Sequence, residues 1–395
     1  MEVLRAGWVV PVTSPPLRDG RVAVSSGRVV WVGRRGDPGE PTAVVRDLGP
    51  GVLLPGLVNA HCHLEASHLA GRLPLGRGFV PWVEALVAAR GTVPEETARE
   101  GTAAAIAFLE RRGTVAVGDV SNMLDHLGRL VASSLWSVVF FELLAWDPLK
   151  ADATMAWAEE RLAAAGRGLS PNVRLAAHAP HSVSPVLLSR LVSRGGPAAM
   201  HLAESPEEVR FLATGDGAWT SFLARRGLGN VAFSPPGVSP VRYVDGLGAL
   251  HPRLVAAHGV QVDDADRAIL ARRGVHVALC PRSNRNLAVG TADVPALLDA
   301  GVRLCLGTDS LASAETLDVL EDAVLLHRQF PQIDPAAVVK MATAGGAEAL
   351  GLTDLGTIER GKAAALAFAA AADVPADPYR FLLSGEARLA RVQRQ

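Results

Sequence analysis

Short apolar runs alternate with amphipathic stretches through the middle of this chain. Eight such runs, rich in Val, Leu and Ala, occur between about residue 53 and residue 350: LPGLVNAHCH, GTVAVGDV, LWSVVFFELLA, VRLAAHAP, PAAMHLAE, RLVAAHGV, GVHVALCP and VRLCLGTDS. Most are separated by stretches with a helical pattern, such as PEETAREGTAAAIAFLERR and SPEEVRFLATG. Eight βα units in succession predict an α/β fold of the (β/α)8 TIM barrel type. An open doubly wound sheet is the alternative, but no GxGxxG sequence follows the first strand.

The two ends of the chain have a different pattern. Residues 1–52 contain short strand-like pieces separated by Gly and Pro, and a similar piece, LGTIERGKAAALAFAA, returns near the C-terminus. We therefore expect residues 1–52 and 353–395 to form a small β-sandwich domain, and residues 53–352 to form the barrel. The turn-rich stretch 233–252 follows the fifth strand, where barrel loops cover the active-site mouth, so it is a candidate substrate loop.

Composition excludes several classes of function. A net charge of -1 over 395 residues gives no general attraction to nucleic acid or to an anionic membrane. The three cysteines contain no CxxC pair, which argues against a disulfide framework and a cysteine zinc site. The N-terminus lacks the pattern of a signal peptide, and the longest apolar run, 363–372, is roughly half the length that spans a bilayer. We expect a cytoplasmic protein.

Polar residues stand at the ends of the predicted strands, where barrel enzymes carry their chemistry. The first strand ends in His61-Cys62-His63, the fifth in His201, the sixth in His258 and the eighth in Asp309. Strand side chains alternate, so His61 and His63 face the same side. Alone, His201 is more typical of a core histidine and Asp309 of a helix cap. Together with the histidine pair they predict a divalent metal site, for zinc or alternatively ferrous iron.

The segments PGLVNAHCHLE, HLAES, AAHGV and LGTDS resemble the amidohydrolase superfamily, and the resemblance spans nearly the whole chain. It implies that His61, His63, His201 and Asp309 are the metal ligands. Binuclear members bridge two ions with a carboxylated lysine of the third or fourth strand.

That lysine has no obvious counterpart in this chain. The fourth-strand segment VRLAAHAPHS contains no lysine, and Lys150 follows the third strand in an expected loop. One ion is therefore expected. Glu142 in the third strand is an alternative bridge, although a buried structural role suits it better.

The spacing His201-Leu202-Ala203-Glu204 resembles the deaminase branch of the superfamily. The resemblance implies that Glu204 protonates a ring nitrogen while activated water attacks the neighbouring carbon. His258 and Asp309 would orient and deprotonate that water. The alternative for Glu204 is an acidic residue of the first helical turn, but two further glutamates already fill that role.

The combination HCHLE, APHS, HLAES, CPRSN and GTDS is most similar to the aminodeoxyfutalosine deaminases. These enzymes convert the adenine of a modified nucleoside to hypoxanthine, giving futalosine on a route to menaquinone. The resemblance makes His181 a substrate contact, with a loop residue that caps a helix as the alternative. Arg282 and Arg285 are candidate partners of the substrate's benzoate, and Trp82 and Glu84 are candidates to cover or bind the sugar.

The alternative hypotheses about function have the same metal site but a different substrate. An adenosine derivative, guanine, cytosine or a chlorinated triazine would be alternatives, and an inactive barrel that serves as a scaffold is a remote one. In each enzymatic reading the partner is a small molecule, purine nucleoside-like in the favoured one. A homodimer remains open.

Overall fold

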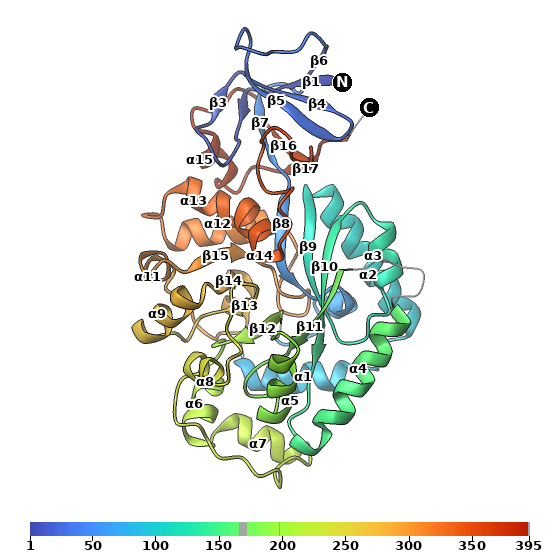
Figure 1. Cartoon of the computed structure of the whole chain (residues 1–395), viewed down its shortest axis with the longest axis vertical. Coiled ribbons are helices and arrows are strands. Elements are labelled where there is room, and N and C mark those ends of the chain that lie inside the picture. Colours follow the sequence, from blue (N-terminus) through green and yellow to red (C-terminus); the bar gives the residue numbers. More distant parts are fainter. Residues whose placement is uncertain (166–171, 197, 394–395) are drawn as a thin grey trace.

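In a computed structural model, which describes residues 1–165, 172–196 and 198–393, eight parallel strands form the centre of the molecule (Figure 1). Each overlaps one of the eight predicted runs. In chain order they are β8 (Leu57–Cys62), β9 (Thr114–Ser121), β10 (Trp136–Leu143), β11 (Asn172–Ala177), β12 (Ala199–Leu202), β13 (Val255–His258), β14 (His276–Leu279) and β15 (Arg303–Leu306).

The eight strands close into a barrel. They form two four-stranded sheets in the orders β11-β10-β9-β8 and β12-β13-β14-β15. At one seam the backbone N–H of His201 donates to the carbonyl of His178 (2.8 Å). At the other seam the N–H of Thr308 donates to the carbonyl of His61 (3.0 Å), and the amide of Asn59 donates to the Thr308 hydroxyl (2.8 Å). The predicted (β/α)8 barrel is confirmed.

Helices follow the strands and surround the barrel (Figure 1). Those between strands are η1 (Leu64–Leu69), α1 (Phe79–Ala89), α2 (Glu95–Arg111), α3 (Leu127–Ala132), η2 (Pro148–Lys150), α4 (Ala151–Ala165), α5 (Pro185–Ser193), α6 (Pro206–Thr214), α7 (Ala218–Arg225), α8 (Pro240–Gly246), α9 (Asp264–Arg273), α10 (Pro281–Asn286) and α11 (Val294–Asp299). After the last barrel strand come α12 (Val319–Gln329), α13 (Pro335–Lys340), η3 (Met341–Gly345), α14 (Gly346–Leu350) and α15 (Pro378–Leu382).

Two of these helices begin and end where the sequence predicts. The stretch PEETAREGTAAAIAFLERR contains α2. In α6, the side chain of Ser205 accepts from the N–H of Glu208 at the start, and Gly215 adopts a left-handed conformation (φ 74°) at the end. In the described part of the chain, no helix is both long and apolar enough to cross a membrane.

Alternation along the strands separates two layers of apolar side chains. Val138 and Phe140 of β10 belong to a cluster with inward residues of the other strands. Phe141 belongs to the larger cluster between strands and helices, and its ring lies 5.2 Å from that of Trp157 on α4. The same alternation directs Glu142, two residues beyond Phe140, toward the interior of the barrel.

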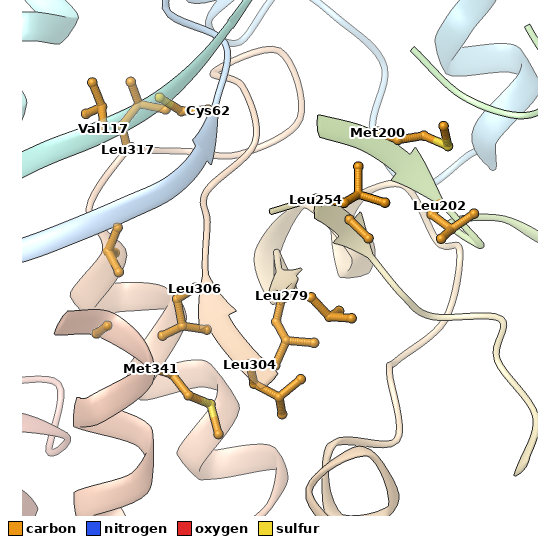
Figure 2. Packing of buried hydrophobic residues seen from close by; sticks show 14 of the residues in the cluster. Cys62, Val117, Met200, Leu202, Leu254, Leu279, Leu304, Leu306, Leu317 and Met341 are labelled. Carbon is orange, nitrogen blue, oxygen red and sulfur yellow. The ribbon is translucent and has the colours of Figure 1, made fainter. Parts of the chain in front are cut away.

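The first barrel strand has an irregular register around the first histidine. The register between β8 and β9 shifts between Asn59 and Cys62. As a result Cys62 points outward, into the layer that also holds Val117 and Leu317 (Figure 2). The two histidines on either side of Cys62 face the other way, as the sequence predicts.

The chain termini form a separate β region at one end of the molecule (Figure 1). Its strands are β1 (Glu2–Arg5), β2 (Trp8–Val9), β3 (Leu17–Arg18), β4 (Gly20–Ser25), β5 (Arg28–Arg34), β6 (Val44–Asp47), β7 (Gly51–Pro55), β16 (Leu366–Ala370) and β17 (Leu389–Arg391). They form two sheets, ordered β5-β4-β1-β6 and β17-β16-β7-β2-β3, around a core that includes Leu4, Val22 and Leu53. Because β7 pairs with β2 and β16, residues 53–55 lie in this region, and the barrel begins slightly later than the expected boundary.

Candidate active site and metal centre

The four predicted metal ligands lie together at the carboxyl ends of the barrel strands. His61, His63, His201 and Asp309 each offer one donor atom, and these atoms lie within 4.8 Å of one another. The Nε2 atoms of His63 and His201 are 3.2 Å apart, and Oδ1 of Asp309 lies 3.4 Å from Nε2 of His63. Nε2 of His61 is buried without a hydrogen-bond partner among the described residues. Three imidazoles and one carboxylate suit zinc or ferrous iron, so the donors fit a single divalent ion.

Burial and mutual contacts set the charges of these ligands. Burial lowers the pKa of His61 and of His63 to about 4, which leaves both rings neutral at pH 7. Burial opposes ionisation of Asp309, but the surrounding imidazoles, first that of His61, hold its pKa well below the usual range. A neutral histidine and an ionised carboxylate are the forms that bind metal.

His201 differs from the other two histidines. Burial lowers its pKa, but the carboxylate of Glu142 outweighs this effect and raises the pKa to about 9. Oε1 of Glu142 lies 3.3 Å from Nδ1 of His201, and Asn122 donates to Oε2 of Glu142 (2.9 Å). Metal binding must therefore displace a proton from the His201 ring.

Glu142 is better suited to orient the ring of His201 than to bind a second metal ion. Glu142, His178 and His201 also bring donor atoms within 4.8 Å of one another. However, Glu142 approaches Nδ1 of His201, whereas Nε2 of that ring faces His63. A second ion here would require one imidazole to hold two metals. Lys150 was expected in a loop; it instead ends the short helix η2, directly before α4, and is exposed.

Two residues of the CPRSN segment, which follows β14, bond side chains at the carboxyl ends of β13 and β15. The hydroxyl of Ser283 donates to Oδ2 of Asp309 (2.6 Å), and Ser313 donates to the same oxygen (2.7 Å). Oδ1 of Asn284 lies 2.8 Å from Nδ1 of His258. These contacts orient a predicted ligand and a predicted base. The sequence marked this segment only by resemblance, and its position directly after a strand end was the available signal.

Glu204 and His258 face each other beside the metal ligands. Oε1 of Glu204 lies 3.6 Å from Nε2 of His258, and both side chains are buried. Burial raises the pKa of Glu204 to about 8 and lowers that of His258 to about 4. At pH 7 this gives a protonated acid beside a neutral imidazole, a combination suited to giving one proton and accepting another.

The backbone is strained where these side chains project. Ala203, His258 and Asp309 all have positive φ values, of 53°, 76° and 58°. Such conformations cost energy in residues with a β-carbon, and they occur often at active sites. Glu208 supports one of these turns, since its carboxylate accepts from the backbone N–H of Glu204 (2.8 Å). The sequence suggested only a helix-dipole role for Glu208.

His181, the predicted substrate contact, is buried among aromatic side chains. Its ring is 4.4 Å from that of Trp219 and 5.8 Å from that of Phe79. Both ring nitrogens are buried, and neither has a hydrogen-bond partner within the described residues. Nδ1 lies 3.9 Å from Oε1 of Glu208, beyond hydrogen-bond range. An imidazole with two unused nitrogens favours a ligand contact over a capping role.

The aromatic neighbours of His181 belong to a cluster beyond the strand ends, which we call the mouth cluster. Its buried members are Leu69, Phe79, Val80, Trp82, Trp146, Phe211, Leu212, Trp219, Phe222, Leu223, Leu287, Val289 and Ala312. Phe233, from the predicted substrate loop, packs against this cluster with its ring stacked 4.7 Å from that of Phe211. The later part of that loop contains α8. Its contact with substrate stays a prediction.

The two residues predicted near the sugar are placed differently. The indole N–H of Trp82 donates to the carbonyl of Ala312 (3.0 Å), so Trp82 can cover the mouth but has no free donor. Glu84 pairs with Arg225 of α7, and both side chains are substantially exposed. This pairing disfavours a role for Glu84 in binding the sugar, because its carboxylate is already paired at a largely exposed position.

The two predicted arginines also differ. The side chain of Arg282 is only 5% exposed, and its guanidinium is bonded to Asp322 and Glu321 inside the protein. These bonds disfavour the predicted contact of Arg282 with a substrate carboxylate, since its donors already have partners inside the protein. Arg285 is 49% exposed and pairs with Glu315 (2.9 Å). It stays a candidate.

A family model and several known proteins match this chain. The model of the amidohydrolase family matches residues 52–388. An aminodeoxyfutalosine deaminase of Deinococcus radiodurans is 36% identical over 354 residues, which cover 83% of this chain and 82% of that protein. A 5-methylthioadenosine/S-adenosylhomocysteine deaminase of Nitratidesulfovibrio vulgaris is 33% identical over 366 residues, covering 87% of this chain and 77% of that protein.

Solved structures show the same fold. An adenosine deaminase of Xanthomonas campestris with bound zinc has a TM-score of 0.79 and 28% identity, over 98% of this chain and 89% of that one. A Helicobacter pylori aminofutalosine deaminase in complex with methylthio-coformycin has a TM-score of 0.87 and 23% identity, over the full length of both chains. The chain belongs to the amidohydrolase family and is a hydrolase that acts on C–N bonds.

Proposed function

We propose that this protein is a deaminase of adenosine-type nucleosides that uses one divalent ion, zinc in the first place. The observation that carries the proposal is the buried pair of Glu204 and His258, 3.6 Å apart at the edge of the four-ligand group. Hydrolytic removal of an amino group from a purine needs a proton donor for the ring and an acceptor for the water proton. This pair offers both next to a metal site.

The residues of the site have the following proposed roles. His61, His63, His201 and Asp309 would hold the ion, which when bound lowers the pKa of a water molecule toward neutrality. Asp309 and His258 would orient the attacking water, and His258 would accept its proton because the ring is neutral at pH 7. Glu204 would give its proton to the ring nitrogen beside the carbon under attack. His258 would pass the proton it took from water to the amino group, which leaves as ammonia, while the hydroxyl proton on the attacked carbon returns to Glu204 as the carbonyl forms.

The proposed substrate is 6-aminodeoxyfutalosine, with futalosine as product on a route to menaquinone. In support, the Deinococcus relative named for this activity is the more similar of the two curated relatives described above. The aromatic mouth cluster suits a nucleoside with a further ring, since aromatic faces bind planar groups. Names given to the relatives also include methylthioadenosine and adenosylhomocysteine, so these are the competing substrates.

A parallel assay tests both levels of the proposal. Zinc-loaded protein is given 6-aminodeoxyfutalosine, adenosine, 5-methylthioadenosine and S-adenosylhomocysteine, and ammonia release is followed with each. We expect the highest kcat/KM with 6-aminodeoxyfutalosine. A higher value with another nucleoside, or equally poor values with all, would refute that substrate and leave a deaminase. No ammonia from any of them would refute the proposed class, and guanine, cytosine and a chlorotriazine, with chloride release, would then be tried.

A further inference from the structure

Arg282 ties the short helix α10 to α12. Its Nε and Nη2 atoms donate to Oδ2 of Asp322 (3.0 and 2.7 Å), and its own backbone N–H donates to Oδ1 of the same carboxylate (3.1 Å). Nη1 donates to Glu321 (2.7 Å) and to the Thr316 hydroxyl (2.8 Å). Nη2 also reaches the carbonyls of Thr316 and Asp318 (2.9 and 3.1 Å). One carboxylate thus binds both the side chain and the backbone of Arg282.

The next two residues after Arg282 touch the active site. Ser283 donates to Asp309, and Asn284 bonds the ring of His258. Both side chains project from α10, which has only six residues, Pro281–Asn286. A helix this short is not stable through its own backbone hydrogen bonds. Its orientation must therefore be set by contacts with other parts of the protein.

The far end of these contacts is anchored to the barrel. Asp318 precedes α12 and accepts from the guanidinium of Arg112 (2.6 Å). Arg112 follows α2 and stands two residues before β9. Both Asp318 and Asp322 are almost fully buried. Arg112, next to β9, is thus connected through α12 to α10 by charge-assisted hydrogen bonds to buried aspartates, and such bonds are shorter and stronger than neutral ones.

We propose that Arg282 is a positioning residue, which holds α10 against α12 so that Ser283 and Asn284 keep Asp309 and His258 in their reactive geometry. The proposal rests on the proposed deaminase function. A positioning role is compatible with the burial of the guanidinium, whereas a contact with substrate is not. Outer partners of metal ligands typically contribute on the order of 10–100-fold in metal affinity or activity.

The decisive variant is the double substitution Arg282→Met with Asp322→Leu. Arg282→Met alone strands a buried carboxylate and can fail to fold, whereas replacing both members of a buried ion pair by apolar residues is often tolerated. If Arg282 serves only stability, the folded double variant keeps its activity. If it positions α10, the double variant stays impaired although no charge is stranded. Arg282→Lys keeps the charge without the fork and should lie between wild type and the double variant.

Two readouts are measured in each variant: kcat with the best nucleoside substrate, and zinc affinity by competition with a chelator. We expect the double variant to lose roughly 10–100-fold in kcat, with a smaller change in KM, and to bind zinc more weakly. The matched control is Arg21→Met with Glu40→Leu, which removes a partly buried ion pair (2.6 Å) in the terminal β region. This control should keep both values.

A cycle with Ser283→Ala/Asn284→Ala tests the route of the effect. If Arg282 acts through these two residues, combining both sets of substitutions adds little to the larger single loss. Fully additive losses, or wild-type kcat and zinc affinity in the folded double variant, would overturn the proposal. If wild type deaminates no nucleoside, the proposed function fails, and zinc affinity alone still decides whether Arg282 positions Asp309.

Discussion

The barrel strands have two parts of opposite character. Their bodies carry apolar side chains in alternating layers, including Leu279 and Leu304 on the outer side (Figure 2). Their carboxyl ends carry buried imidazoles and carboxylates, and His258 and Asp309 adopt positive φ there. Apolar burial stabilises a fold, whereas buried polar groups and strained backbone cost free energy unless something compensates. The difference indicates that the carboxyl ends are retained for chemistry and the bodies for stability.

The largest effect should follow removal of a ligand from the carboxyl ends. His63→Ala should lose zinc and reduce deamination to background, because two imidazoles and one carboxylate remain. Zinc analysis and an ammonia assay check this. The control is His68→Gln, since His68 bonds the carbonyl of Glu65 and is not one of the four ligands. Wild-type turnover in the His63 variant would contradict the assigned ligand set.

Glu204→Gln comes next, because it removes a proton while keeping the shape of the side chain. We expect kcat to fall by roughly 10²–10⁴-fold at unchanged zinc content. Glu207→Gln, three residues along and in the first turn of α6, is the matched control and should be nearly silent. Substantial turnover by the Glu204 variant would refute its role as the acid.

Glu142→Gln should have a smaller effect. Zinc affinity and activity should fall on the order of 10–100-fold when measured near pH 9, where the His201 proton competes little. In wild type, zinc affinity should rise as pH rises toward 9, because protonated His201 cannot bind metal. In the variant this rise should end at a lower pH, since the charge that raises the His201 pKa is gone. An identical pH dependence in both proteins would count against this contact.

Arg285 lies at the exposed rim, so its effect should be smaller again. Arg285→Ala should raise KM for 6-aminodeoxyfutalosine by roughly tenfold, the worth of a hydrogen bond to a charged group. KM for adenosine, which has no carboxylate, should not change. An equal change for both substrates would argue against a benzoate contact.

In the strand bodies, substitutions should change stability and leave catalysis alone. Leu304→Ala should lower the free energy of unfolding by about 2–5 kcal/mol, because Leu304 is buried with Met341 in the outer layer. The kcat of the folded variant should stay within about twofold of wild type. Denaturant unfolding and a deaminase assay measure the two values. A large loss of kcat in folded protein would contradict the assignment of stability to the strand bodies and of catalysis to the carboxyl ends.

The sequence predicted best what strand alternation and barrel geometry determine. The eight strands, and the meeting of His61 and His201 with Asp309, follow from apolar runs and from the rule that strand ends converge. The contacts of Ser283 and Asn284 did not follow, because they depend on how a six-residue helix is tilted. The inward orientation of Arg282 did not follow for a related reason, since a guanidinium after a strand end can turn toward the site or away from it.

The central claim is that the carboxyl ends form a site in which one ion supports deamination. It is tested most directly by stripping the protein with a chelator and titrating zinc back while ammonia release from the best nucleoside is followed. The account predicts no activity without metal and full activity at one zinc ion per chain. Activity that survives removal of the metal, or that needs two ions per chain, would contradict it.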